Sequence, residues 1–191
     1  MIGSEIYDLF KTMTDGEEFA SDTDAVAVLN MADAAIRGER NWERLKKTAA
    51  LALGSSSLSA ITDFDRPLKL WAVVGTKVAD KVELKQAPYD DRFNTDYDWY
   101  YDAAANTINF IKDVIPSNWL SYLLDYKYIP AALDLAATPW MHPDYHALYA
   151  YEMVRVFKRA DADFDFYKGY GTEYEIVHAQ AIDWNESLAG R

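Results

Sequence analysis

The spacing of apolar side chains divides the chain into three segments. In residues 4–47 and 143–188, apolar positions recur at intervals of three, four or seven, which is typical of amphipathic helices. Residues 46–130 instead hold short runs rich in aromatic and branched side chains, separated by Gly, Pro and Asn, which indicates strands and turns. The pattern predicts an α+β fold in which a helical bundle carries an inserted antiparallel β-domain.

Two helices are predicted in the first segment. Ser4 is placed to cap a helix that reaches about Thr14, and Ser21 to cap a second helix with acids in its first turn. The second helix has one apolar stripe, made of Ala25, Val28, Leu29, Ala32 and Ile36. Gly38 ends or bends it.

The central segment predicts a series of short strands. The clearest signal runs from Trp99 to Phe110, where two strand-like runs flank a turn of small residues with Asn106. Further strands are expected at 48–53, 58–61, 67–74, 78–85 and 119–129. Gly54 and the serines after it predict a hairpin between the first two of these.

The last segment returns to helical spacing. One helix is expected over 144–159, after Pro143. A second follows in which Gly169 and Gly171 weaken the helix, so it either has a kink there or starts late, near Thr172. Residues 185–191 have few apolar side chains, so we expect this C-terminal docking tail to become ordered only against a partner.

Composition limits the classes of protein that fit. A chain of 191 residues, half of them hydrophobic, suits a single domain with a sizeable core. Cysteine is absent, which excludes disulfides, thiolate zinc sites and a cysteine nucleophile and favours a reducing cytosol. The first five residues lack the pattern of a signal peptide and no apolar run reaches the length of a membrane span, so we expect a soluble protein with no membrane partner.

The charge is strongly acidic and unevenly distributed. The formal net charge is −12, and residues 1–36 carry eight acids against Lys11 alone. Residues 37–47 reverse the sign with five basic side chains against Glu39 and Glu43. An acidic chain is poorly suited to hold nucleic acid, because affinity for phosphates comes from clustered Lys and Arg. The short basic run fits the C-terminal end of a helix or a contact with an acidic partner.

The histidines provide only a poor metal pattern. His142 and His146 have the i, i+4 spacing that lets two imidazoles share a metal on one helix face. Pro143 places His142 at or before the helix cap, which spoils that geometry. His178 lies far from both in the sequence. We therefore assign no metal ligand and no cofactor.

Acidic residues offer the main alternative to a structural role. Asp90, Asp91, Asp96, Asp98 and Asp102 lie in or beside an aromatic loop, and paired acids beside aromatic rings are what a glycosidase needs. The alternative function is accordingly a carbohydrate-binding or glycoside-hydrolysing domain. Asp161, Asp163 and Asp165 alternate as in a calcium loop, but the glycine and the terminal Glu are missing. No catalytic residue is assigned, and we expect a protein that is not an enzyme.

Five short motifs follow one another in a fixed order. The first matches R-x-W-x-x-L-K-K-T at Arg40, Trp42, Leu45, Lys46, Lys47 and Thr48. A turn and a strand–turn–strand element follow at Asp63, Phe64, Asp65, Arg66, Pro67 and at Asn106, Thr107, Ile108, Asn109, Phe110. A tyrosine-rich strand from Tyr126 to Pro130 and a helix opening with Pro143, Tyr145 and His146 complete the series. In this order, over about residues 21–185, the chain resembles the head-to-tail connector (neck adaptor) proteins of tailed bacteriophages.

The resemblance implies a structural role in the virion. Connector proteins of this family form a ring beneath the portal protein, usually a dodecamer, and extend the channel through which DNA passes. Their C-terminal helix and tail dock onto the portal, and the β-region meets the next neck or tail protein. For this chain the resemblance implies a place in the virion neck, synthesis in the host bacterial cytoplasm and no specific binding of DNA. The chain departs from the family in its acid-rich loop 88–98 and lacks a pair of arginines before Pro130.

Overall fold

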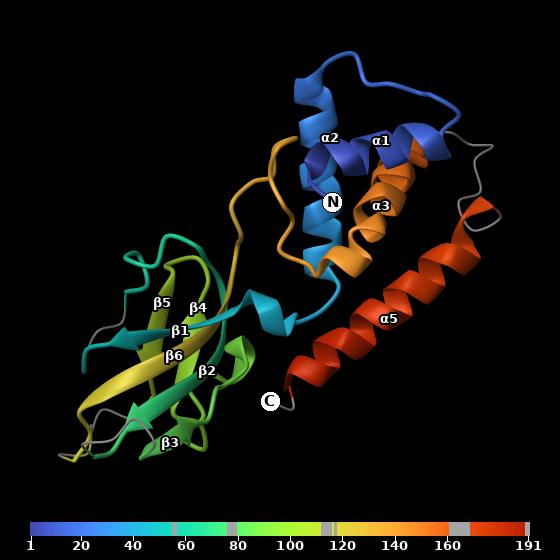
Figure 1. Ribbon diagram of the computed structural model, residues 1–191. Helices are drawn as coiled ribbons and strands as arrows, with labels where there is room; N and C mark the ends of the chain where they lie inside the picture. The colour runs from blue at the N-terminus through green and yellow to red at the C-terminus, as the bar shows by residue number, and fades with distance from the viewer. Residues whose placement is uncertain (55–56, 76–79, 112–115, 117, 161–168, 190–191) are drawn as a thin grey trace. The chain divides into compact units, whose positions relative to one another are not determined.

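Helices and strands are segregated along the chain. The computed structural model describes residues 1–54, 57–75, 80–111, 116, 118–160 and 169–189, and it divides into two units. The helical unit comprises Met1–Arg44 and Pro130–Arg191, and the β unit comprises Leu45–Ile129 (Figure 1). This arrangement confirms the predicted α+β class, a helical bundle with an antiparallel β-region inserted into it.

The helical unit is built around one helix that touches the others. It contains α1 (Gly3–Met13), α2 (Asp22–Gly38), α3 (Ala147–Phe157) and α5 (Gly171–Ala189), with short 3-10 turns η3 (Pro143–Tyr145) and η4 (Lys158–Ala160). Helix α3 contacts α1, α2 and α5. The apolar residues at this centre are fully or almost fully buried, among them Ile6, Phe10, Leu29, Ile36, Leu148, Tyr149 and Met153.

The two N-terminal helices begin differently from each other. Ser21 caps α2 as predicted, because its hydroxyl accepts a hydrogen bond from the backbone N–H of Asp24 at 3.2 Å. The expected cap of α1 at Ser4 is wrong, since the helix begins at Gly3 and the N–H of Ser4 donates to the carbonyl of Leu135 at 2.7 Å. A Cβ at Gly3 would lie 2.3 Å from the carbonyl oxygen of Asp134, so only glycine permits this close approach.

The β unit has two antiparallel sheets. The larger one has four strands in the order β1-β6-β2-β3, and the smaller one is the hairpin β4-β5. Their bounds are β1 (Lys46–Leu51), β2 (Phe64–Val73), β3 (Lys81–Leu84), β4 (Trp99–Asp102), β5 (Thr107–Phe110) and β6 (Ser121–Tyr128). The 3-10 turns η1 (Glu43–Leu45) and η2 (Tyr89–Asp91) precede β1 and β4.

One predicted hairpin does not form. The expected pairing of 48–53 with 58–61 is wrong, because β1 pairs with β6, the last strand of the unit. Residues 58–61 make a turn in which the N–H of Ile61 donates to the carbonyl of Leu58 at 2.9 Å. Leu58 itself is fully buried in the core of the β unit. Leu58 is therefore apolar because it is buried in a turn. Sequence spacing alone does not distinguish an apolar residue in a buried turn from one in a strand.

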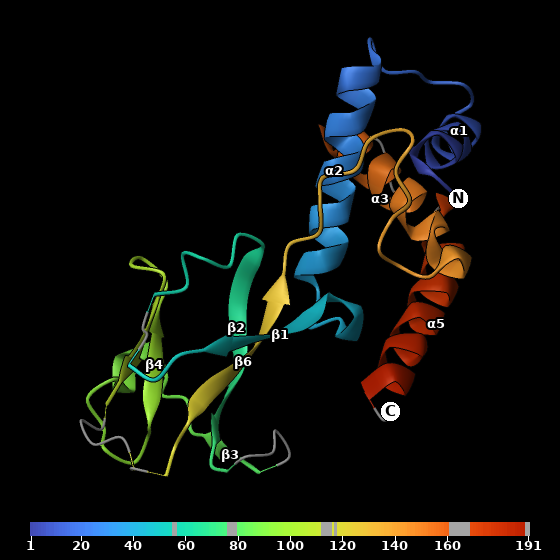
Figure 2. The same cartoon turned by 60° about the vertical axis from the view of Figure 1, so that its left-hand side comes forward.

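The predicted strand–turn–strand from Trp99 to Phe110 is confirmed as β4-β5. Asn106 has φ 51°, in the left-handed region that Asn tolerates, and the carboxylate of Asp102 accepts hydrogen bonds from the N–H groups of Ala104 and Ala105. The hairpin packs on one face of the larger sheet (Figure 2). Trp99 is fully buried between them, and its indole N–H donates to the carbonyl of Leu84 at 3.0 Å.

We expect Trp99→Ala to destabilise the β unit by about 4 kcal/mol, because it leaves a large cavity and removes the indole hydrogen bond to Leu84. Urea unfolding followed by circular dichroism measures the loss. The control is Phe93→Ala, which removes a ring that is 80% exposed and should change the free energy of unfolding by less than about 0.5 kcal/mol. Equal losses in the two variants would contradict the placement of Trp99 in the core.

Candidate functional site

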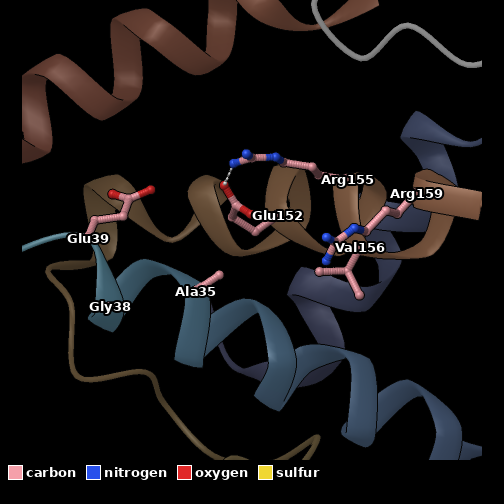
Figure 3. Close-up of a pocket in the computed structure, with 7 residues that line it drawn as sticks. All are labelled: Ala35, Gly38, Glu39, Glu152, Arg155, Val156 and Arg159. Carbon is pink, nitrogen blue, oxygen red and sulfur yellow. Dashed lines mark hydrogen bonds and ion pairs between the residues drawn. The ribbon is translucent and has the colours of Figure 1, made fainter.

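A pocket lies in the helical unit where the end of α2 runs beside α3. Its volume is about 540 Å³, and it is lined by Ala35, Gly38, Glu39, Glu152, Arg155, Val156 and Arg159. Figure 3 shows the side chains of Glu152 and Arg155 joined above α3, with Ala35 and Gly38 on α2. Two acids and two arginines give the pocket a mixed charge, and Gly38 leaves open space at its α2 side.

A chain of hydrogen bonds joins this pocket to α5. The hydroxyl of Tyr174 donates to Glu152 at 2.9 Å and lies 3.3 Å from an oxygen of Glu39. Arg155 contacts the same oxygen of Glu152 at 3.1 Å, and the ring of His178 lies 2.6 Å from Glu39. Only 2% of Glu152 is exposed, so these donors offset the cost of burying its carboxylate.

Burial sets the protonation state of Tyr174. Burial raises the pKa of its hydroxyl far above the ordinary value, and the carboxylates of Glu152 and Glu39 act in the same direction. The hydroxyl therefore stays protonated and serves as a donor to the two acids. This geometry makes the cluster a clamp that links α2, α3 and α5, and gives Tyr174 no role as a base or nucleophile.

A second set of contacts holds the far end of α5. The side-chain oxygen of Asn185 accepts a hydrogen bond from the N–H of Glu43 at 2.5 Å, and Asn185 is buried. Trp184 packs beside His142 and Tyr145, with ring centroids 5.8 and 5.6 Å away. Residues 185–189 are thus the last turn of α5, which corrects the expectation that the tail 185–191 becomes ordered only against a partner. Residues 190–191 lie outside the described part.

A further buried acid ties α2 to α3. The carboxylate of Asp33 is only 4% exposed, and it accepts hydrogen bonds from the indole of Trp140, the hydroxyl of Tyr149 and the guanidinium of Arg37. Burial, followed by the charge of Asp33, raises the pKa of Tyr149 well above the ordinary value. All of these partners are donors, so the cluster is a structural network without a free reactive group.

The structure does not bring the predicted histidines together as ligands. His146 is fully buried, with Nε2 2.8 Å from the carbonyl of Met141 and Nδ1 3.0 Å from the N-terminal ammonium of Met1. Nδ1 also lies 2.7 Å from the carbonyl oxygen of Met1, so both ring nitrogens are occupied by protein groups. His142 instead accepts from the N–H of Asp144, at the start of η3, and His178 belongs to the clamp.

The predicted acidic residues do not form a pair beside the aromatic rings. Asp98 accepts from the N–H of Lys85 at 2.8 Å, whereas Asp102 closes the β4-β5 turn. These two acids stand at opposite ends of β4, about 13 Å apart along a strand. Asp90, Asp91 and Asp96 are exposed in the loop before β4. The calcium-like residues Asp161, Asp163 and Asp165 lie outside the described residues.

Sequence reasoning missed the clamp itself. Glu152 lies in the middle of a helix whose neighbouring positions Met153 and Val154 are buried, and a charged residue at such a place requires a partner. That signal identifies Glu152 as a buried acid. It does not identify Tyr174 or Glu39 as members of the clamp. Tyr174 lies 22 positions from Glu152 along the chain and 135 positions from Glu39, so sequence spacing does not reveal these contacts.

Two kinds of feature are absent from the described residues. In that part of the chain, no group of three or more His, Cys, Asp or Glu is arranged to hold a metal ion. None of the helices there has the length and apolar character needed to cross a membrane. Comparison with known proteins gives no matching family model and no curated relative.

We expect Tyr174→Phe to lower the free energy of unfolding by about 2 kcal/mol, because it removes a donor from the buried carboxylate of Glu152. Hydrogen exchange of the amides in α5 should also become faster, since the clamp holds that helix. Tyr145→Phe is the control, because it keeps the ring contacts with His142 and Trp184. Unchanged protection of α5 in Tyr174→Phe would show that the clamp does not hold the helix.

We expect His146 to make stability depend on pH. Burial, assisted by the N-terminal ammonium, holds the pKa of His146 below its ordinary value. The unfolded chain therefore binds a proton first as pH falls, so this contribution to stability is full above about pH 6.5 and is lost below it. Urea unfolding at pH 7.5 and 5.5 should show a smaller difference for His146→Gln than for the wild type. His142→Gln, at an exposed ring, should keep the wild-type difference.

Proposed function

We propose that this protein is a virion structural protein that forms a head-to-tail connector ring between the portal and the tail of a tailed bacteriophage. In the proposed role it extends the DNA channel, contacts the portal on one side and meets the next neck or tail protein on the other. The observation that carries the proposal is the order of the chain, in which a helical unit is interrupted by an antiparallel β unit between Arg44 and Pro130. That order is the one that the resemblance to connector proteins implies.

The residues that carry the resemblance have structural tasks at the corresponding places. Trp42 is fully buried, and its indole N–H donates to the carbonyl of Ile36, where the chain leaves α2. Asp63 bonds both Lys47 and the hydroxyl of Tyr126, which ties the start of β2 to β1 and β6. Asn106 makes the β4-β5 turn, and His146 anchors the start of α3. These roles support the motifs as determinants of a fold.

The distribution of charge supports passage of DNA without binding. The helical unit has nine basic and twenty acidic residues, a net charge of −11, whereas the β unit has ten basic and eleven acidic residues. A surface with this excess of acid repels phosphates, so a duplex passes beside it without being held. The proposed ring therefore uses its acidic character in the channel and its structured units for protein contacts.

The test of the proposed function mixes the purified protein with purified portal. We expect the protein alone to be a monomer or a weak oligomer, and portal to convert it to a ring of matched or related symmetry because it raises the local concentration of subunits. Native mass spectrometry and electron microscopy measure the change. Duplex DNA at physiological salt should not bind appreciably.

The control for this mixture is a portal preparation whose ring has been dissociated, which offers no template. A protein that stays monomeric with intact portal, or that binds duplex DNA tightly, contradicts the proposal. Hydrolysis of a glycan that is lost in Asp96→Asn or Asp98→Asn would instead favour the carbohydrate-active alternative.

A further inference from the structure

The β unit carries a basic aromatic surface on the face of its larger sheet that points away from the core. We call it the lysine–tryptophan platform and define it as Lys69, Trp71, Lys81 and Glu83. Strand pairing places Trp71 beside Glu83, and Leu70 and Ala72 on either side of Trp71 are buried on the other face. The ring of Trp71 thus belongs to the outer face, where it is partly exposed.

The platform has a fixed geometry. The ammonium groups of Lys81 and Lys69 lie 4.2 and 5.4 Å from the centroid of the Trp71 ring. Lys69 also pairs with Glu83 at 3.0 Å, and the indole N–H of Trp71 donates to Asp125 at 2.7 Å. These contacts hold an aromatic ring between two cations in one orientation, which lowers the entropy lost when a partner docks.

The charge of this face is opposite to that of the chain as a whole. Its exposed basic residues are Lys46, Arg66, Lys69 and Lys81, and its acids are Glu83 and Asp125, the latter already held by Trp71 and by Thr48. A local excess of basic charge on a chain of net charge −12 favours an acidic partner surface.

A complementary surface stands on the same unit. We call it the acidic knob and define it as Asp90, Asp91, Phe93 and Asp96, in the loop before β4. Phe93 is 80% exposed, the most exposed of the large hydrophobic side chains in the described residues. All three acids are exposed around it. The guanidinium of Arg92 lies over the Phe93 ring, 4.9 Å from its centroid, so the knob sets one cation against three exposed acids. Its net charge stays negative, which suits a basic aromatic surface.

Successive turns fix the shape of the knob. The N–H of Asp91 donates to the carbonyl of Pro88 at 3.0 Å, and the N–H of Asn94 donates to the carbonyl of Asp91 at 2.8 Å. The N–H of Asp96 then donates to the side chain of Asn94 at 3.0 Å. The loop thus holds Phe93 out in solvent without relying on a partner for its shape.

The knob and the platform lie on opposite sides of the β unit. The hairpin β4-β5 packs on the inner face of the larger sheet, and η2, which begins the knob, contacts β4. The platform is on the outer face of that sheet, opposite the buried Leu70 and Ala72. Within one β unit the knob therefore does not contact the platform. A contact between these complementary surfaces requires two copies of the chain.

We propose that the acidic knob of one copy docks on the lysine–tryptophan platform of the next copy, with Phe93 against Trp71 and the aspartates against the lysines. The contact is heterologous, because two different surfaces meet, and repetition of such a contact produces a ring when the rotation closes. The inference deepens the proposed connector function and rests on it for ring closure. The pairing of the two surfaces rests on their charge and chemistry alone.

Crosslinking tests this contact directly, because the chain has no cysteine of its own. Thr95→Cys places a thiol beside the knob, and Ala50→Cys places one on the platform face, in the strand row of Trp71. The two full-length variants are mixed at high concentration with a short bis-maleimide. We expect the mixed dimer to exceed, by about 10-fold, that from Thr95→Cys with Thr62→Cys, an exposed control site.

Charge reversal gives the second measurement. Phe93→Ala added to the Thr95→Cys variant should reduce the crosslink about 10-fold. Lys69→Glu with Lys81→Glu, added to the Ala50→Cys variant, should have the same effect. Asp90→Lys with Asp91→Lys, mixed with the reversed platform, should restore it. High salt should weaken the wild-type pair, since the contacts are charged and exposed.

The outcomes separate this inference from the proposed function, because portal is not needed here. A specific, restorable crosslink supports the contact even if portal fails to form a ring with the protein. A ring that forms with portal while the crosslink stays at the control level overturns the contact alone. Duplex DNA that binds the wild type and is released by Lys69→Glu with Lys81→Glu would assign the platform to nucleic acid and overturn the inference too.

Discussion

The antiparallel pairing of β1 with β6 is the constraint on which the two-unit organisation depends. It sets Lys46 opposite Lys127, so the chain enters and leaves the β unit at neighbouring positions of one sheet. The β unit is an insertion in the helical unit, and its two ends are held together by this pairing. Closing such a loop costs the helical unit little conformational entropy, because that cost grows slowly with loop length. Residues 1–44 and 130–191 therefore build one helical unit around a long interruption.

Polar contacts supplement a small apolar seam in holding the last helix in this unit. The buried positions of α5 are Gly171, Tyr174, Ala181 and Asn185, which form a narrow seam with one large ring. Its attachment thus depends on Tyr174 with Glu152 and on Asn185 with Glu43. Such contacts are directional and lose their value when one partner is removed, so they fix the position of a helix that has little apolar surface to bury.

The sequence predicted elements best where a local rule determined them. Ser21 and Asn106 were identified because capping and left-handed turns depend on neighbouring residues. Leu58 was assigned to a strand because burial in a turn and in a strand give the same short apolar run. The clamp was not foreseen, since Glu39, Glu152 and Tyr174 meet only through tertiary packing. The exposed acids of loop 88–98 were noticed, whereas the platform became evident only from the register of β2 and β3.

The edges of the larger sheet carry features that discourage pairing with another chain. Its outer strands are β1 and β3, and unpaired edges of this kind invite pairing with another chain. Strand β3 has only four residues and carries Lys81 and Glu83, while β1 begins with Lys46 and Lys47. Charged side chains and short length are the means by which natural sheets discourage edge pairing. The same lysine that protects the β3 edge, Lys81, lies against Trp71 on the outer face. One lysine thus protects the edge and forms part of the lysine–tryptophan platform.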